Sequence, residues 1–264
     1  MKKYPFLNFK SFFWIALFSL FLASCVPQKK ILYMQVKNEA DTMSTFTNQR
    51  KIDYRIQPGD NLYIRVVSMD EKTNLFLNSM GGGQYSQNVN SDASVYLNSY
   101  MVSTQGTIQF PLTGEVFVKN LTVAQVKDTI QKKLSLYLKE SVVIVKLVNF
   151  NITLLGEVKR PGQYKIYQNN INLFEAVSMA GDLSDFAKRS DVTIIRQSKT
   201  GSKVYHVDMT KKDVLSSPYF YLKPNDIVYV PPLKGKQFSF ATFPYGVVFS
   251  ALSTALLLIS FFKK

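Results

Sequence analysis

The chain has 264 residues and a formal net charge of +14 at pH 7, and 46% of its residues are hydrophobic. That length suffices for one large domain or for two small domains with cores of their own. One cysteine and one histidine exclude an intramolecular disulfide and a zinc site built from those ligands, so we expect no metal and no cofactor.

Residues 1–24 have the organisation of a secretory signal peptide. Lys2 and Lys3 precede the apolar run 12–22 (FFWIALFSLFL), and small residues follow it. The run is too short to span a bilayer stably, which takes about 20 apolar residues. The segment 22–25 (LASC) resembles the lipobox of bacterial lipoproteins. We therefore predict cleavage before Cys25 and acylation of its thiol by lipids such as palmitate.

The positive charge does not indicate nucleic acid. Cleavage removes Lys2, Lys3 and Lys10 and no acid, which lowers the net charge from +14 by three, to +11. The remaining basic residues are scattered as pairs along an exported chain. Scattered solvated charge is one interpretation, and attraction to anionic glycans or lipid headgroups is the other.

A polar tether is predicted over 25–51, because no apolar period is sustained there. Order begins at the Pro-Gly turn of 54–61, followed by a strand at 62–67. Residues 71–100 are rich in Gly, Asn and Ser and are predicted to be a flexible insertion. The triple glycine at 81–83 lacks the Gly-Lys-Ser/Thr of a phosphate loop.

Short strands and one helix complete a first unit over 52–150. Strands are predicted at 107–111, 114–118 and 142–148. Thr122 is placed to cap the helix. Its apolar positions recur at helical spacing, at Val123, Val126, Ile130, Leu134 and Tyr137. Strands and a helix in this order predict an α+β unit.

A second unit is predicted over 152–232. Asn172 caps a short helix over 173–180, and Gly181 ends it. Segments 192–196 and 203–207 form a hairpin, and 227–230 is the last strand. These pieces suit a β-grasp-like domain.

The closing segment 243–262 has 20 residues without a charge and predicts a transmembrane helix. Small and weakly polar residues lie along one face of it. They suit close helix–helix contact or a shared interior. Alternatively, the helix faces lipid all round and its serines bond to their own backbone. The face consists of Gly246, Ser250, Ser253, Leu257 and Ser260.

Five segments in order resemble the outer-membrane polysaccharide export (Wza-like) family. They are 54–60 (YRIQPGD), 102–114 (VSTQGTIQFPLTG), 121–126 (LTVAQV), 156–162 (GEVKRPG) and 224–230 (PNDIVYV). The last two resemble the start and end of the family's soluble-ligand-binding β-grasp (SLBB) domain. With the sequence between them, these segments cover 52–232.

The resemblance implies a lipid-anchored homo-oligomeric ring, commonly of eight copies, that carries capsular polysaccharide or exopolysaccharide across the outer membrane. It places most of the chain in the periplasm. It also implies an inner-membrane co-polymerase with a tyrosine-kinase-like module as partner. This chain differs from the best-known form, because it has one β-grasp domain instead of two and a more uniformly apolar last helix.

No catalytic site is expected. The lone His206 lies on a predicted strand with Asp208 on the same face, without a nucleophile. Asp53 and Glu115 lie in turns or at strand edges that serve the fold, and Asp60 and Glu157 are expected to accept backbone hydrogen bonds in their turns. The function predicted is therefore transport. A membrane-anchored adaptor without a pore and a glycan-binding lipoprotein without a pore are the alternatives.

Overall fold

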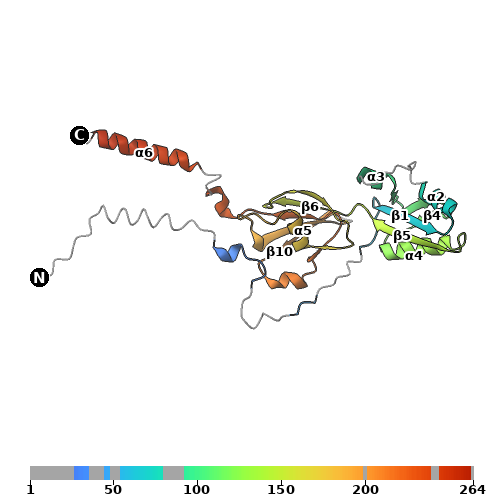
Figure 1. Ribbon diagram of the computed structural model, residues 1–264. Helices are drawn as coiled ribbons and strands as arrows, with labels where there is room; N and C mark the ends of the chain where they lie inside the picture. The colour runs from blue at the N-terminus through green and yellow to red at the C-terminus, as the bar shows by residue number, and fades with distance from the viewer. Residues whose placement is uncertain are drawn as a thin grey trace.

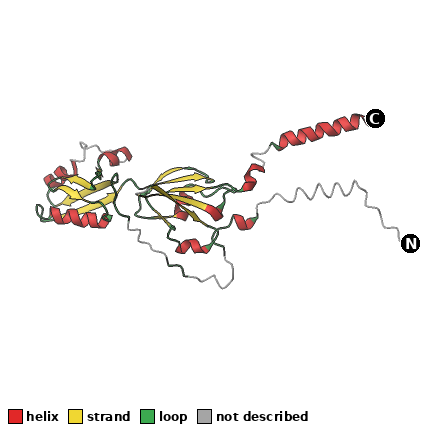
Figure 2. Cartoon of the chain, turned by 180° about the vertical axis from the view of Figure 1, so that it is seen from behind, coloured by secondary structure: helices red, strands yellow, loops and turns green. Residues whose placement is uncertain are grey.

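The computed structural model of the chain describes residues 27–35, 45–47, 54–79, 92–198, 201–238 and 244–262. Two units follow each other along the molecule, each mixing helices and strands (Figure 1). The N-terminal helix η1 (Gln28–Lys30) and the C-terminal helix α6 (Tyr245–Phe262) both lie at the end of the second unit that faces away from the first. Figure 2 shows the same order from behind.

The first unit is built on an antiparallel sheet in the order β2-β1-β5. Strand β1 pairs with β5 from Leu62, which lies opposite Leu147, to Ser68, and Leu147 packs against the cores of both units. A separate ribbon of β3 and β4 covers the same core. The elements are β1 (Asn61–Ser68), α2 (Glu71–Ser79), α3 (Asp92–Leu97), β2 (Tyr100–Met101), β3 (Thr107–Phe110), β4 (Gly114–Phe117), α4 (Val123–Leu134) and β5 (Ser141–Leu147).

Helix α4 begins at the predicted cap. The Thr122 hydroxyl accepts a hydrogen bond from the Gln125 backbone N–H at 3.2 Å, and the Gln125 side chain accepts one from the Thr122 N–H at 2.9 Å. This capping box satisfies two backbone donors that the first turn leaves open. The predicted end was wrong, since α4 stops at Leu134 and Tyr137 lies beyond it, 60% exposed.

The prediction of one flexible insertion over 71–100 was wrong at both ends, because α2 and α3 occupy them. Leu77 of α2 is buried in the first core. The Asn78 side chain donates to the Val66 carbonyl at 2.8 Å and accepts from the Val66 N–H at 3.1 Å, and Asn74 does the same at Ser68. The two amides thus satisfy the edge of β1 that the short β2 leaves unpaired. Residues 80–91 lie outside the described part of the chain.

The second unit is a five-stranded sheet in the order β10-β9-β12-β6-β7, with helix α5 packed against it. Its central pair, β12 and β6, is parallel, with Val228 opposite Leu154 and both side chains fully buried. The elements are β6 (Asn151–Gly156), β7 (Gly162–Lys165), β8 (Ile171–Asn172), α5 (Leu173–Met179), η3 (Arg189–Asp191), β9 (Val192–Ser198), β10 (Gly201–Val207), η4 (Lys212–Ser216), β11 (Tyr221–Leu222), β12 (Ile227–Val230) and η5 (Lys234–Phe238).

Helix α5 has the predicted cap and the predicted stop. Asn172 and Glu175 form a capping box, with bonds of 2.9 and 2.8 Å. Gly181 follows the helix with φ of +76°, a conformation that favours glycine. The predicted hairpin is confirmed as β9 paired with β10, with Val207 opposite Val192.

A buried ion pair holds the turn before β12. Arg196 of β9 donates from Nε to Asp226 Oδ1 at 2.8 Å and from Nη2 to Asp226 Oδ2 at 2.6 Å. The Asp226 side chain is fully buried and also accepts from the Lys223 N–H at 2.7 Å. The pair therefore links the central strands to the turn that leads into β12.

Candidate functional site

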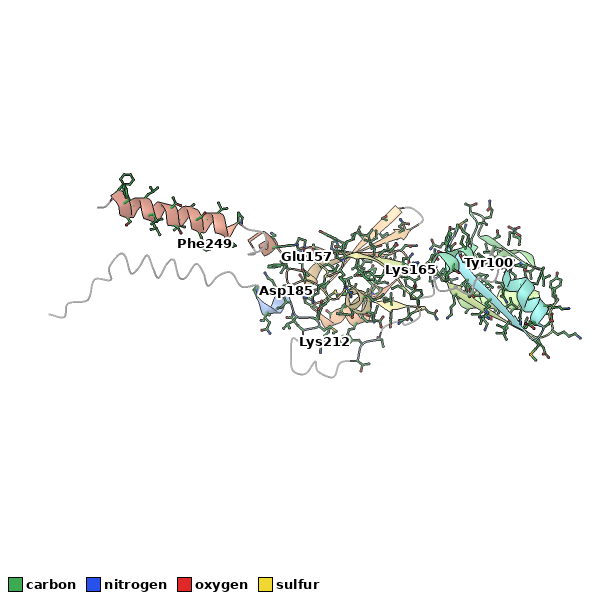
Figure 3. All side chains as sticks on the ribbon, turned by 45° about the horizontal axis from the view of Figure 1, so that its top comes forward. Tyr100, Glu157, Lys165, Asp185, Lys212 and Phe249 are labelled. Carbon is green, nitrogen blue, oxygen red and sulfur yellow. The ribbon has the colours of Figure 1, made fainter. Side chains whose placement is uncertain are left out.

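Helix α6 is long and apolar enough to cross a membrane. Its 18 residues have a mean hydropathy of 2.0, and none of them is buried against the rest of the described chain. At 1.5 Å per residue the helix is about 27 Å long, close to the hydrocarbon thickness of a bilayer. Figure 3 shows Phe249 on this helix, apart from the two units. A helix this apolar needs surroundings other than water.

The weakly polar face of α6 keeps its predicted residues on one side of a continuous helix. The Ser250 hydroxyl donates to the Val247 carbonyl at 2.9 Å, and the Ser253 hydroxyl donates to the Phe249 carbonyl at 2.8 Å. Open space surrounds Gly246. These local bonds suit a lipid-facing helix, and the exposed small residues suit a neighbouring helix, so the role of the face remains a prediction.

Cys25 lies outside the described residues, but the segment that follows it at 27–35 docks onto the second unit. The Tyr33 hydroxyl donates to Asp182 Oδ1 at 2.5 Å. The Tyr33 ring lies edge-on to Phe174 with centroids 5.9 Å apart, and the Arg189 guanidinium lies 5.1 Å from its centroid. Burial and the bond to Asp182 raise the pKa of Tyr33 to about 12.

Backbone hydrogen bonds complete this docking. Met34 N–H donates to the Met209 carbonyl at 3.2 Å, and Gln35 N–H donates to the Thr210 carbonyl at 2.7 Å. Gln35 forms an isolated parallel bridge with Lys211. The prediction of a tether over all of 25–51 was therefore wrong for 27–35, because these residues belong to the second unit.

The linker that leads towards α6 is fastened to the same unit. Leu233 N–H donates to the Phe186 carbonyl at 2.7 Å, and Lys188 N–H donates to the Pro231 carbonyl at 2.9 Å. In η5 the Lys236 ammonium pairs with Glu157 Oε1, and Ser184 donates to Glu157 Oε2 at 2.6 Å. Although burial opposes it, these two bonds hold the pKa of Glu157 below its usual value.

The loop 182–189 binds both the N-terminal segment 27–35 and the linker that leads towards α6. Asp182 and Arg189 at its ends hold Tyr33, and residues 186–188 between them hold the linker. Figure 3 marks Asp185 and Glu157 in this part of the second unit. The loop therefore places the N-terminal segment and the start of the C-terminal linker at one end of the molecule.

We expect the contact between Tyr33 and Asp182 to make the free energy of unfolding depend on pH. The pKa of Tyr33 is raised in the folded chain, so its stabilising contribution is complete below the unfolded value of about 10 and is lost as the pH rises towards 12. Tyr33→Phe should cost about 1 kcal/mol at pH 8. Its deficit should shrink between about pH 10 and pH 12, measured by urea unfolding. Tyr137→Phe, on an exposed ring, is the control, and a constant deficit would contradict the assignment.

Four residues that were considered for catalysis bind other residues of the fold: Asp60, Glu157, His206 and Asp208. Asp60 accepts from the Gln57 N–H at 2.8 Å, as predicted, whereas Glu157 was expected to accept backbone bonds and instead binds side chains. His206 Nδ1 lies 2.7 Å from Asp191 Oδ1, so its partner is not Asp208. Asp208 follows the end of β10 and accepts from Thr210.

No group of three or more His, Cys, Asp or Glu side chains that could hold a metal ion occurs among the residues that the structure describes. Asp53 lies outside those residues.

Comparison with known proteins matches both units to family models. Residues 48–148 match the polysaccharide biosynthesis/export protein family, and residues 151–230 match the SLBB domain. The chain is therefore similar to the polysaccharide export family over its first unit and to the SLBB domain over its second. We therefore call the first unit the export domain and the second unit the SLBB domain. Members of this family are transport proteins, which confirms the prediction that the chain is not an enzyme.

Two curated relatives are both named EPS I polysaccharide export outer membrane protein EpsA. The protein from Ralstonia solanacearum is 31% identical over 137 residues, which covers 50% of this chain and 36% of the relative. The protein from Ralstonia nicotianae is 34% identical over 91 residues, which covers 33% of this chain and 24% of the relative. The matches thus span about a third or less of these relatives' length.

Proposed function

We propose that this chain is a subunit of a conduit that exports capsular or extracellular polysaccharide through the outer membrane, without chemistry. The observation that carries the proposal is the exposed apolar helix α6 at the end of the molecule where the N-terminal segment also docks. The match to the export family and the relatives named as outer-membrane export proteins support the same substrate and location. The SLBB domain is proposed to be β-grasp-like.

Attachment to one membrane at both ends follows from this arrangement. Cys25 is two residues before Pro27, and the segment from Pro27 to Gln35 is held on the SLBB domain. Acyl chains on Cys25 would therefore enter the bilayer close to the SLBB domain, at the end that carries α6. The export domain lies at the other end and would project into the periplasm.

If several copies assemble, the apolar helix α6 of each copy can pack against the α6 helices of its neighbours. The face of Gly246 and Ser253 allows neighbouring helices to approach closely. A ring of copies would enclose a passage, and the projecting export domains would meet the inner-membrane co-polymerase. The copy number of eight is carried over from the family resemblance.

The alternative function is a membrane-anchored adaptor without a pore of its own. It is favoured by the hydrogen bonds of Ser250 and Ser253 to their own helix, because such a helix needs no polar neighbour. Membrane fractionation separates the two functions. An inner-membrane location would favour the adaptor, and an outer-membrane location favours the conduit.

Deletion and complementation test the proposal. Loss of the gene should abolish surface or secreted polysaccharide, and the wild-type chain should restore it. Cys25→Ser should leave the signal peptide uncleaved and the product without lipid, and export should fall strongly, measured by secreted glycan and by mass spectrometry of the mature N-terminus. Normal polysaccharide in the deletion strain would overturn the proposed function.

A further inference from the structure

The outer face of the β3–β4 ribbon carries polar side chains that the fold does not use. Ile108, Phe110 and Val116 point from the ribbon into the core of the export domain. On the other face, Gln109 lies directly opposite Glu115 in the strand register, and both are exposed. Side chains of directly opposed residues lie about 5 Å apart at Cβ. The pair can therefore contact one small ligand.

A shallow hollow of about 390 Å³ opens over this face. Its volume lies at the lower end of the range for small-molecule sites, about 300–1,000 Å³. It is formed by β2, the following loop and the ribbon. The side chains that matter here are Tyr100, Ser103, Gln105, Thr107, Gln109 and Glu115.

Three of these side chains have no hydrogen-bond partner within the part of the chain that the structure describes: the Tyr100 hydroxyl, the Gln109 amide and the Glu115 carboxylate. By contrast, the hydroxyls of Ser103 and Thr107 lie 2.8 Å apart and bond to each other. The hollow therefore offers a ligand a hydroxyl, an amide and a carboxylate that are free to bind.

Tyr100 is held in place before any ligand binds. Its ring lies 5.3 Å from the Phe110 ring, centroid to centroid, and is half-buried. Burial raises the pKa of Tyr100, so its hydroxyl remains a donor at neutral pH. Figure 3 marks this residue in the export domain.

The chemistry of the lining selects against anions despite the basic composition of the chain. Among the residues that the structure describes, no lysine or arginine lines the hollow. The neighbouring Lys133 ammonium donates to the backbone carbonyl of Glu115 at 3.1 Å. The Glu115 carboxylate would repel a uronate or a phosphate, and it would accept hydrogen bonds from hydroxyls. An uncharged sugar ring, with several hydroxyls that donate and accept, matches this set of groups.

We propose that this hollow is a contact site for an uncharged sugar residue of the exported chain. The inference rests on the proposed function, because it names where that same polysaccharide touches the export domain. An open, shallow site with few polar groups binds weakly, which lets a long glycan advance from one copy of the site to the next.

The test uses full-length protein in detergent and oligosaccharide fragments of the glycan that the deletion strain fails to export. Binding is measured by saturation-transfer NMR. The double variant Gln109→Ala/Glu115→Ala should lose about tenfold in affinity, because it removes two hydrogen-bonding groups. The matched control Lys127→Ala/Asp128→Ala, on the exposed face of α4, should stay within about twofold. Glu115→Gln keeps the shape of the side chain and should bind more weakly than wild type but better than the double variant.

The outcomes separate this inference from the proposed function. Slower export by the Gln109/Glu115 variant, with unchanged thermal unfolding and membrane level, would support the contact site. Wild-type binding and export by that variant, in a strain whose deletion does lose the glycan, would overturn the contact site alone. A deletion strain that loses no glycan would overturn both, and a lost glycan made only of anionic residues would overturn the contact site.

Discussion

A chain that ends at Phe238 will fold into both domains and will not export polysaccharide. The two cores lie entirely before that residue, and none of α6 is buried against them. Removing α6 therefore costs the domains no packing. It removes the segment proposed to cross the membrane, so secreted glycan should fall to the level of the deletion strain. Export at the wild-type level by the truncated chain would instead favour a glycan-binding lipoprotein without a pore.

Paired substitutions within α6 distinguish assembly from simple insertion. Gly246→Leu/Ser253→Leu fills the weakly polar face, whereas Val248→Leu/Ala255→Leu places the same side chains on the opposite side of the helix. Both variants keep the helix apolar enough to insert. If copies meet at the predicted face, only the first pair should reduce the oligomer seen on gel filtration in detergent. If the two pairs of substitutions changed the oligomer equally, the face that carries Gly246 and Ser253 would not be the contact between copies.

Asp226→Ala will destabilise the SLBB domain by about 3–5 kcal/mol, the range for removing one partner of a buried ion pair. The substitution leaves the Arg196 guanidinium, which is 14% exposed, without its carboxylate. It also leaves the Lys223 N–H without an acceptor. Urea unfolding of the full-length protein in detergent, followed by circular dichroism, measures the loss.

A double-mutant cycle shows whether the unpaired arginine causes that loss. Arg196→Met/Asp226→Leu removes both charges and keeps apolar volume, so it should recover much of the stability that Asp226→Ala loses. Lys188→Ala is a control for an exposed ion pair, because its partner Asp191 is also accessible, and its effect should be below about 1 kcal/mol. A loss in Asp226→Ala no larger than in Lys188→Ala would show that the buried pair does not support the turn.

Local signals in the sequence predicted the parts of the fold that depend on neighbouring residues. Thr122 and Asn172 each precede a helix by one residue and have Gln or Glu three positions later, so both capping boxes could be anticipated. Gly181 likewise marked the end of α5, because glycine readily adopts the positive φ that commonly follows a helix. The weakly polar face of α6 was equally visible, since it needs only helical spacing.

Contacts between distant residues were not visible in the sequence. Tyr33 binds Asp182 across 149 positions, and one aromatic residue in a polar segment has no period that would reveal it. Asn74 and Asn78 belong to a composition typical of loops, yet they bond to the backbone edge of β1. A short helix stabilised by tertiary contacts does not show in local propensity. The hollow over Gln109 and Glu115 likewise depends on the pairing of two strands.

Electron microscopy of the full-length lipidated protein, purified in mild detergent, tests the central claim most directly. The account predicts closed rings with a central opening, a collar of detergent at the end that carries α6, and loss of that collar in the chain that ends at Phe238. Single, separate molecules at every protein concentration would contradict it.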